Sequence, residues 1–369
     1  EMCIRDRYEP APMLRPGHFM LGGELKERVK EFPRSPERTI GGEFKVALRT
    51  AYSPTQMLVG SILEGKPYPV RAALVILTNP LATYPDSNRV YKALTKLDFI
   101  VAADIFETPT TAIADIVLPA ATFLEHEDIG YWPVWFGDVR IYPKFFDPLG
   151  ESWPDAKIIN ELAKRVGVKK YFFEDENEVL DLWLKPANLT YKEFAENVKS
   201  IFARSLYNPF KVRGYETPSG KVEIYSQQLE ELGISPLPRF EELAESLLEP
   251  SEGYPLLLTN GKEELYILSG FRNLTKLNIQ VKDPVVRLNP DIAKNLGLNE
   301  GDWVYVETKQ GKVKQKLLTD PYLDPRVVLA SFGWWGESNI NILTDSNPPY
   351  DPATGSLRLK GIPCKVYKA

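Results

Sequence analysis

Apolar and polar positions divide the chain into an α/β part followed by an all-β part. The nearly continuous apolar runs at 71–78 and 99–103 are typical of parallel strands that are buried on both faces. Apolar residues recur at helical spacing between these runs, after a capping segment at 85–87, and a third apolar run follows at 116–118. This order predicts a βαβ fold, in which ligands bind at the carboxyl ends of the strands.

The segment at 152–200 reads as helical. Ile159, Ala163 and Val166 share one helix face, and the run from Thr190 to Glu193 has the sequence of a capping box. We expect these helices to cover the parallel sheet. Turn-forming residues then lead into a short expected strand at 221–225, and a linker follows up to 253.

From residue 254 onward the pattern changes to short strands. Apolar runs at 255–259 and 327–332 predict two of them, and alternating segments at 303–307 and 313–317 predict a hairpin. The pair Asn289-Pro290 is a helix start signal, and Gly297 suits the end of that helix. Short strands with one small helix predict a closed barrel.

Composition and charge exclude several classes of function. The chain has 369 residues and a net charge of −5, without the concentrated basic face that nucleic-acid binding requires, and no apolar run is long enough to span a membrane. The two cysteines, Cys3 and Cys364, lie far apart in sequence, and the two histidines cannot build a metal site alone. No G-x-G-x-x-G follows a predicted strand, so the nicotinamide fingerprint is absent.

Polar residues beside the predicted strand ends are candidates for ligand binding. Asp104 follows a strand and offers a carboxylate to a guanine edge or a ribose diol, although it could equally cap a turn. Trp334 and Trp335 follow the last long apolar run, and Asn339 adds an amide that can read a heterocycle edge. A tryptophan pair that only fills the core is the alternative. We interpret His126 as a histidine of a charged loop.

Several segments, in order, resemble one protein family. Thr217–Tyr225 looks like the "TPSGKIE" segment of the molybdopterin oxidoreductases, the family of dimethyl-sulfoxide reductase and formate dehydrogenase. Further segments resemble the same family: Asn79-Pro80, 97–106, 114–120, 288–304, 333–336 and the ending at 351–366. Each motif alone is weak, but their order is specific. The resemblance covers about 60–369 and is closest to the branch that includes acetylene hydratase.

The resemblance implies a fold and a cofactor. The fold is a partial doubly wound, Rossmann-like α/β domain at 8–248, followed by a double-psi β-barrel at 249–369. Residues 1–7 match neither domain, and we expect them to be a non-native leader. Family members hold molybdenum or tungsten between two molybdopterin guanine dinucleotides. Their metal ligand and any iron–sulfur cluster belong to an N-terminal part that this sequence does not match.

The predicted function is therefore cofactor binding without a catalytic or metal-ligating residue in this chain. The family commonly has Thr-Gly-Arg where this chain has Asn260-Gly261-Lys262, which makes bidentate contact there doubtful. Gly220 and Lys221 of the "TPSGKIE" segment could simply form a turn. The residues that the resemblance places at the cofactor are Asn79, Pro80, Asp104, Thr108, Thr259, Asn260, Gly261, Lys262, Gly333, Trp334, Trp335, Asn339 and Lys365.

Three interpretations of the chain remain open at this point. It is the C-terminal part of a truncated oxidoreductase that is inactive alone, a naturally split cofactor-binding subunit, or a redox-inactive scaffold of a larger complex. The expected partner is the missing N-terminal half or a complementary subunit. An electron-transfer subunit is a further expected partner. We expect a cytoplasmic location. The substrate and the choice between molybdenum and tungsten are not encoded in this part of the family fold.

Overall fold

The computed structural model describes residues 35–44, 53–131, 138–185, 188–202, 215, 217, 219–237 and 253–369. They fall into two compact units, one within Leu118–Ser226 and one formed by Arg34–Val117 together with Gln227–Ala369. The second unit contains both the parallel strands and the barrel, on either side of the expected boundary at 248. The expected leader at 1–7 and most of the expected linker lie outside the described residues.

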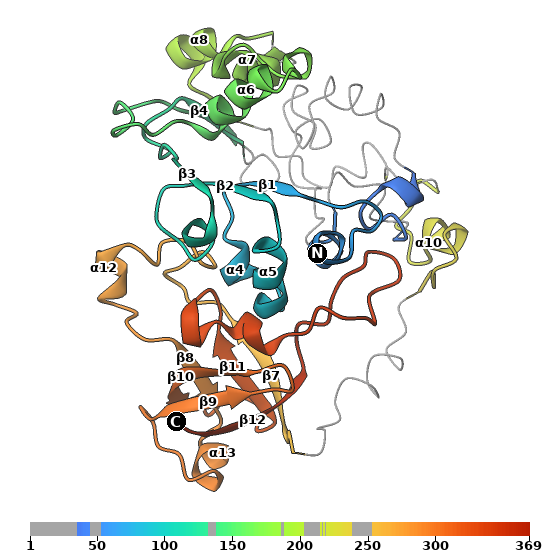
Figure 1. Cartoon of the computed structure of the whole chain (residues 1–369), viewed down its shortest axis with the longest axis vertical. Helices are drawn as coiled ribbons and strands as arrows, with labels where there is room; N and C mark the ends of the chain where they lie inside the picture. The colour runs from blue at the N-terminus through green and yellow to red at the C-terminus, as the bar shows by residue number, and fades with distance from the viewer. Residues whose placement is uncertain are drawn as a thin grey trace. The chain divides into compact units, whose positions relative to one another are not determined.

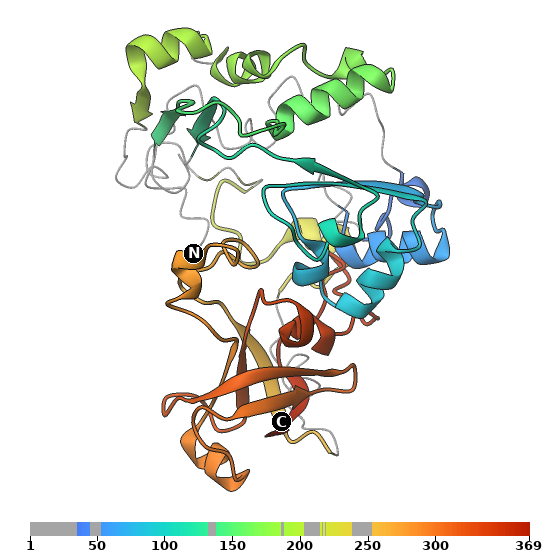
Figure 2. The same ribbon diagram turned by 60° about the vertical axis from the view of Figure 1, so that its left-hand side comes forward.

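A three-stranded sheet with the order β1-β2-β3 begins the second unit (Figure 1). Its strands are β1 (Ala72–Ile76), β2 (Phe99–Asp104) and β3 (Ile116–Pro119), and β1 pairs with β2 in parallel. Helices α3 (Thr55–Glu64) and α5 (Ser87–Leu94) lie on the same side of β1 and β2 (Figure 2). They pack against the buried face of the strands, which carries Val75, Ile100 and Ala102. The strands and the helix between them are confirmed.

The other face of this sheet corrects one expectation. Alternate residues of parallel strands point to opposite faces, and the face opposite Val75 and Ile100 carries Leu74, which is 38% exposed, and Phe99, which is 42% exposed. Burial on both faces is therefore wrong for the described residues, because α3 and α5 cover one side only. The doubly wound, Rossmann-like arrangement stays a prediction.

The first unit contains a second sheet that the sequence pattern did not reveal. Its strands β4 (Asp128–Tyr131), β5 (Asp138–Tyr142) and β6 (Ser200–Phe202) are antiparallel. Ile129 and Val139 of this sheet share a core with Leu180, Leu184 and Phe194. Residues of α7, α8 and η7 therefore pack against this antiparallel sheet, and the expectation that the helices at 152–200 cover the parallel sheet stays a prediction. The helical segments are α6 (Asp155–Arg165), η5 (Lys169–Tyr171), α7 (Glu176–Leu184), α8 (Tyr191–Glu193) and the π-helical turn η7 (Phe194–Val198).

Local signals in the first unit behave as expected, with one exception. Thr190 and Glu193 form the predicted capping box at the start of α8. No strand forms at 221–225, where Thr217 Oγ1 donates to the carbonyl of Lys221 at 2.6 Å and Gly220 has a φ of +65°. A turn replaces the expected strand, because side-chain hydrogen bonds close the chain on itself there. A short helix, α10 (Gln227–Glu231), follows in the second unit.

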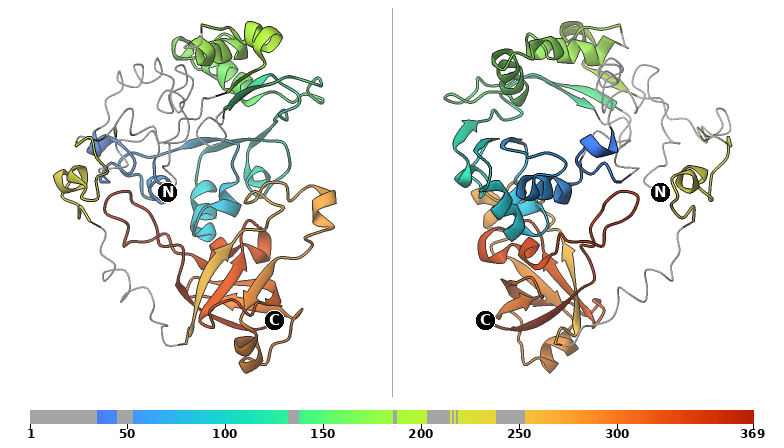
Figure 3. Two further views of the ribbon diagram at one scale, coloured as in Figure 1. Left: turned by 180° about the vertical axis from the view of Figure 1, so that it is seen from behind. Right: turned by 45° about the vertical axis from the view of Figure 1, so that its right-hand side comes forward.

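Six strands close into the expected barrel, with the order β10-β8-β11-β7-β12-β9. Two neighbouring pairs, β7 with β11 and β8 with β10, are parallel, and the others are antiparallel. The barrel strands are seen from behind in the left view of Figure 3. Their bounds are β7 (Leu256–Gly261), β8 (Val285–Leu288), β9 (Trp303–Glu307), β10 (Lys312–Thr319), β11 (Val327–Ser331) and β12 (Ile362–Lys368).

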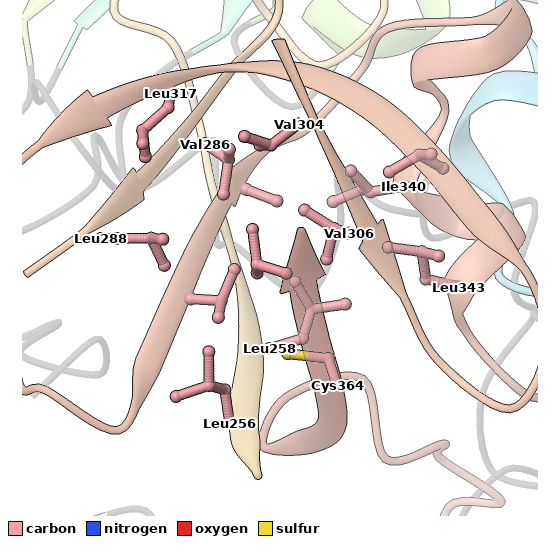
Figure 4. Close-up of a cluster of buried hydrophobic side chains, with 14 of the residues drawn as sticks. Leu256, Leu258, Val286, Leu288, Val304, Val306, Leu317, Ile340, Leu343 and Cys364 are labelled. Carbon is pink, nitrogen blue, oxygen red and sulfur yellow. The ribbon is translucent and has the colours of Figure 1, made fainter. Parts of the chain in front are cut away.

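The interior of the barrel is a packed apolar core (Figure 4). Its fully buried residues include Val286, Leu288, Val304, Val306 and Leu317. Because alternate residues of a strand point into the barrel, apolar and polar positions alternate in the sequence of these strands. Helix α13 (Pro290–Asn295) begins as predicted, with the Asn289 side chain accepting from the amide of Asp291. The remaining short helices are η2 (Pro36–Arg38), α4 (Pro80–Thr83), η4 (Thr111–Ile113), α12 (Thr275–Asn278), η8 (Gly336–Ser338) and η9 (Ile340–Leu343).

Within the described ranges, no helix combines the length and the apolar character that a membrane span needs.

Cys364 provides a probe for barrel integrity. Its side chain is fully buried in the barrel core, and burial raises the pKa of its thiol to about 12. A buried, protonated thiol reacts slowly because the thiolate is the nucleophile. In a Cys3→Ser background we expect Cys364 to resist iodoacetamide at pH 8 until denaturant unfolds the barrel. Mass spectrometry across a urea series tests this, and rapid labelling without denaturant would contradict it.

Candidate functional site

The carboxyl ends of β1 and β2 carry the first group of predicted site residues. Asn79 occupies the N-cap position of α4 without a side-chain capping bond and is 6% exposed, and Pro80 takes the first position of that helix. The hydroxyl of Thr110, from the loop after β2, donates to Asn79 Oδ1 at 2.7 Å. The Nδ2 of Asn79 is buried and has no hydrogen-bond partner within the described residues. Asn79 thus presents an unused pair of N–H donors at the edge where parallel sheets bind ligands.

Asp104 is the last residue of β2, and Thr108 lies in the loop that follows it. One carboxylate oxygen of Asp104 accepts from the amide of Phe106 at 3.3 Å, so the turn-capping interpretation describes its present contact. The amide of Thr108 donates to Thr111 Oγ1 at 2.7 Å, and its hydroxyl accepts from the amide of Thr111. Both residues order this loop, and their predicted contact with a cofactor stays a prediction.

A barrel loop meets the same edge of the sheet. The side-chain amide of Asn273 donates to the carbonyl of Glu107 at 3.3 Å, which joins the loop after β7 to the loop after β2. The structure therefore brings the strand ends of the sheet and the loops of the barrel together within one compact unit. A site at this junction draws residues from both predicted domains.

Asn339 and Asn341 bind the barrel to α4. The Nδ2 of Asn339 donates to the carbonyl of Leu81 at 2.7 Å and contacts Ser87 Oγ at 3.1 Å. The Nδ2 of Asn341 donates to the carbonyl of Ala82 at 2.8 Å. Both asparagines are buried. Figure 1 shows α4 and α5 next to the helical turns of this segment. The amide donors of Asn339 are committed to the protein in this structure.

Gly333 lies at a sharp turn that leaves β11. Its φ is +87°, and a Cβ atom would overlap the backbone oxygen of Leu268. Only glycine fits this conformation and this close approach together. The turn sets the course of the following residue, Trp334, toward the loop after β7.

Arg272 is the central residue that the sequence interpretation missed. Its guanidinium carbon lies 4.0 Å from the ring centroids of both Tyr266 and Trp334. Its Nε donates to the carbonyl of Gly333 at 3.0 Å, and its Nη2 donates to the carbonyl of Phe332 at 2.7 Å. An arginine in a loop carries no signal of burial, yet this side chain is 6% exposed. Two rings and two carbonyls thus fix the guanidinium in one orientation.

The cluster around Arg272 has unused hydrogen-bonding atoms. The Nη1 of Arg272, the Nε1 of Trp334 and the Oε1 of Glu263 are buried and have no hydrogen-bond partner within the described ranges. Burial lowers the pKa of Arg272 to about 10, and the neighbouring Tyr266 and Glu263 raise it in part. Unpaired buried polar groups cost free energy and call for a ligand or water. These unpaired atoms, and separately the Nδ2 of Asn79, are available to polar groups of a ligand such as the cofactor that the family resemblance implies.

The remaining predicted residues of this region belong to β7 and to the segments that follow β7 and β11. Thr259, Asn260 and Gly261 belong to β7 and pair with β11, and Gly261 accepts from the amide of Phe332 at 2.9 Å. Lys262 follows them and is exposed, and Trp335 is half-buried beside the turn at Gly333.

Lys365 lies away from the other predicted residues. Its Nζ pairs with Glu307 at 2.9 Å on the barrel wall, and its neighbour Cys364 pairs with Leu256. Leu256 is at the opposite end of β7 from Gly261, roughly 16 Å along a strand of this length. The structure therefore does not bring Lys365 to the cluster.

The described ranges contain no group of three or more His, Cys, Asp or Glu side chains that could hold a metal ion.

Family models match both parts of the chain. The model for the molydopterin dinucleotide binding domain matches residues 256–363, which include the barrel strands β7 to β11 and the start of β12. The model for molybdopterin oxidoreductase matches residues 42–165, which include the parallel strands. The two matches meet at the junction described above.

Individual relatives cover most of this chain. It is 31% identical over 342 residues to acetylene hydratase of Syntrophotalea acetylenica, covering 86% of this chain and 46% of that protein. It is 30% identical to the F420-dependent formate dehydrogenase subunit alpha of Methanocaldococcus jannaschii, covering 73% of this chain and 39% of that protein. The solved structure of acetylene hydratase from Pelobacter acetylenicus superimposes with a TM-score of 0.74 at 27% identity, covering 91% of this chain and 50% of that chain. The chain thus spans about half the length of these relatives or less.

Proposed function

This chain belongs to the molybdopterin oxidoreductase family, and we propose that it forms the cofactor-binding part of an enzyme that uses two molybdopterin guanine dinucleotides with molybdenum or tungsten. The observation that carries this proposal is the set of unpaired buried polar atoms where the sheet ends meet the barrel loops. When bound, the metal and its dithiolenes would supply the redox chemistry. The chain supplies binding and orientation.

In this proposal, the polar residues at the junction of sheet and barrel fall into two groups with different roles. Asn79 and the Arg272 cluster offer hydrogen-bonding atoms to the cofactor. The bonds from Asn339 and Asn341 to α4 keep the barrel at a fixed position against the sheet ends. Fixed donors lose little freedom when a ligand binds, which favours affinity. Cofactor recognition therefore depends on groups from both predicted domains.

Addition of the cofactor should stabilise the chain. Molybdopterin guanine dinucleotide released from a purified enzyme should raise the thermal midpoint of the full chain, because a ligand that binds only the folded state adds about 2.7 kcal/mol at 100 times its Kd. Differential scanning fluorimetry under anaerobic conditions measures the shift. NAD is the matched control, since it is also a dinucleotide. An equal shift with NAD, or no shift with the cofactor, would contradict the proposal.

The isolated chain should show no oxidoreductase turnover. No segment of its sequence matches the part of the family that carries the metal ligand, so we propose that the remainder of the enzyme lies on a longer chain or on a second subunit. Formate, nitrate and sulfoxide are tested with artificial electron carriers, and a complete enzyme of the family serves as positive control. Metal-dependent turnover by the isolated chain would contradict this prediction.

A further inference from the structure

One outer face of the barrel carries lysines and aromatic rings side by side. Strands β9, β10 and β12 follow one another around the barrel, and Val304, Val313 and Val366 point from them into the core. Residues at the other alternate positions of these strands therefore lie on the outside. We call this set the lysine face, and its members are Trp303, Tyr305, Glu307, Lys312, Lys314, Lys316, Lys365 and Tyr367.

The rings of the lysine face each lie close to an ammonium group. The distances from Nζ to ring centroid are 4.4 Å for Lys312 and Tyr305, 5.6 Å for Lys314 and Trp303, and 5.7 Å for Lys365 and Tyr367. A cation–π contact orients an ammonium group without neutralising its charge. The lysines are therefore held against the barrel wall as positive charges.

The lysine face has a charge opposite to that of the whole chain, whose net charge is −5. Two of its four lysines form ion pairs, which are Lys316 with Asp283 at 3.0 Å and Lys365 with Glu307 at 2.9 Å. Among the described residues, Lys312 and Lys314 form no ion pair. A local excess of positive charge attracts acidic partners and raises the rate at which they associate.

We propose that the lysine face is a docking surface for an acidic segment of a partner protein. Lys312, Lys314 and Lys316 occupy alternate positions of β10, so their side chains leave the strand at intervals of roughly 7 Å. Carboxylates at alternate positions of an extended segment have the same spacing. This inference goes beyond the proposed function and does not depend on it, because the proposed function assigns no role to these lysines.

Two other anionic partners fit the lysine face less well. Bases of single-stranded nucleic acid stack on open aromatic rings, but ammonium groups lie over Tyr305 and Trp303. Glu307 and Asp283 would repel the phosphates of a nucleic acid or of an anionic membrane surface. A protein segment can carry basic groups among its acidic ones and so match both signs of charge.

Labelled peptides test the docking surface on the full chain. A fluorescein-labelled peptide with glutamate at alternate positions is compared with the same peptide carrying glutamine at those positions. Fluorescence anisotropy gives each Kd. We expect the glutamate peptide to bind at least about tenfold more tightly, and this difference should shrink as sodium chloride rises from about 0.02 to about 0.3 M. An oligothymidylate of equal charge and phosphatidylserine vesicles are the nucleic-acid and membrane probes.

A matched pair of double variants locates the binding. Lys312→Gln combined with Lys314→Gln should weaken the glutamate peptide by about fivefold or more, because two exposed ion pairs with the peptide are lost. Lys92→Gln combined with Lys294→Gln is the control, since both lysines are exposed and lie outside the lysine face. The control makes the same change in net charge and should alter the Kd by less than about twofold. The thermal midpoint of each variant confirms folding.

Each outcome supports or overturns the docking surface. Weakening that is confined to the variant of the lysine face supports it. Equal weakening by both double variants would overturn it, because binding would then follow net charge alone. Tighter binding of oligothymidylate or of the vesicles would overturn it in favour of that partner, and failure of the glutamate peptide to bind would overturn it outright. Stabilisation by molybdopterin guanine dinucleotide should persist in the Lys312 and Lys314 variant, so these results leave the proposed function to its own test.

Discussion

Replacing Gly333 with alanine should destabilise the chain by about 2–5 kcal/mol. The backbone of Gly333 has a φ of +87°, which costs an L-residue roughly 1–2 kcal/mol. The new methyl group would also overlap the backbone oxygen of Leu268, and forcing an extra carbon into a packed site costs about 1–3 kcal/mol. Since a backbone atom cannot rotate away as a side chain does, the turn or the loop has to move. Urea unfolding of the full chain measures the loss.

Gly336 is the matched control for this substitution. Its φ is +66°, but a Cβ atom there would meet no atom within 4 Å. Gly336→Ala should therefore cost only the backbone contribution, about 1–2 kcal/mol. Equal losses for the two variants would show that the contact with Leu268 contributes nothing. The Gly333 variant should also bind molybdopterin guanine dinucleotide less tightly, because the displaced turn carries the carbonyl to which Arg272 donates.

Replacing Asn339 with alanine should lower the stability of the cofactor-free chain by about 1–3 kcal/mol. The substitution removes the donor to Leu81 and the contact with Ser87, and it removes the oxygen that accepts from the amide of Asn341 at 3.1 Å. Because Asn339 is 4% exposed, water cannot replace these bonds. Thermal midpoint and affinity for molybdopterin guanine dinucleotide are measured on the same preparation.

The two measurements distinguish the roles considered for Asn339. A fall in stability with unchanged cofactor affinity is the result that the observed hydrogen bonds predict. A loss of cofactor affinity that exceeds the loss of stability would support the role expected from the family resemblance. Asn347→Ala is the control, since that side chain is exposed and donates to Asp345, two positions before it. This substitution should change stability by less than about 0.5 kcal/mol.

The location of the site was only partly predictable. Asn79 and Pro80 were expected at the carboxyl end of a parallel strand, and the structure places them at the end of β1, beside the loop after β2. Lys365 was expected from its position in a family segment, but its partner Glu307 comes from the neighbouring strand β9. Arg272 was not expected at all, since its burial depends on rings and carbonyls that lie up to 62 positions further along the chain.

The sequence by itself determined the family and most local elements of the parallel sheet and the barrel, but not the antiparallel sheet β4-β5-β6. Strands, helix caps and the hairpin depend on residue periodicity and on contacts within a few positions, so Asp86, Thr190 and Asn289 cap their helices as the sequence predicts. Tertiary structure alone decided which polar side-chain atoms form hydrogen bonds within the protein. Asn339 meets Leu81 across 258 positions, and Arg272 is left with one unpaired nitrogen only because two carbonyls take the others. Such long-range pairings follow from how the sheet and the barrel loops pack, and no local pattern records them.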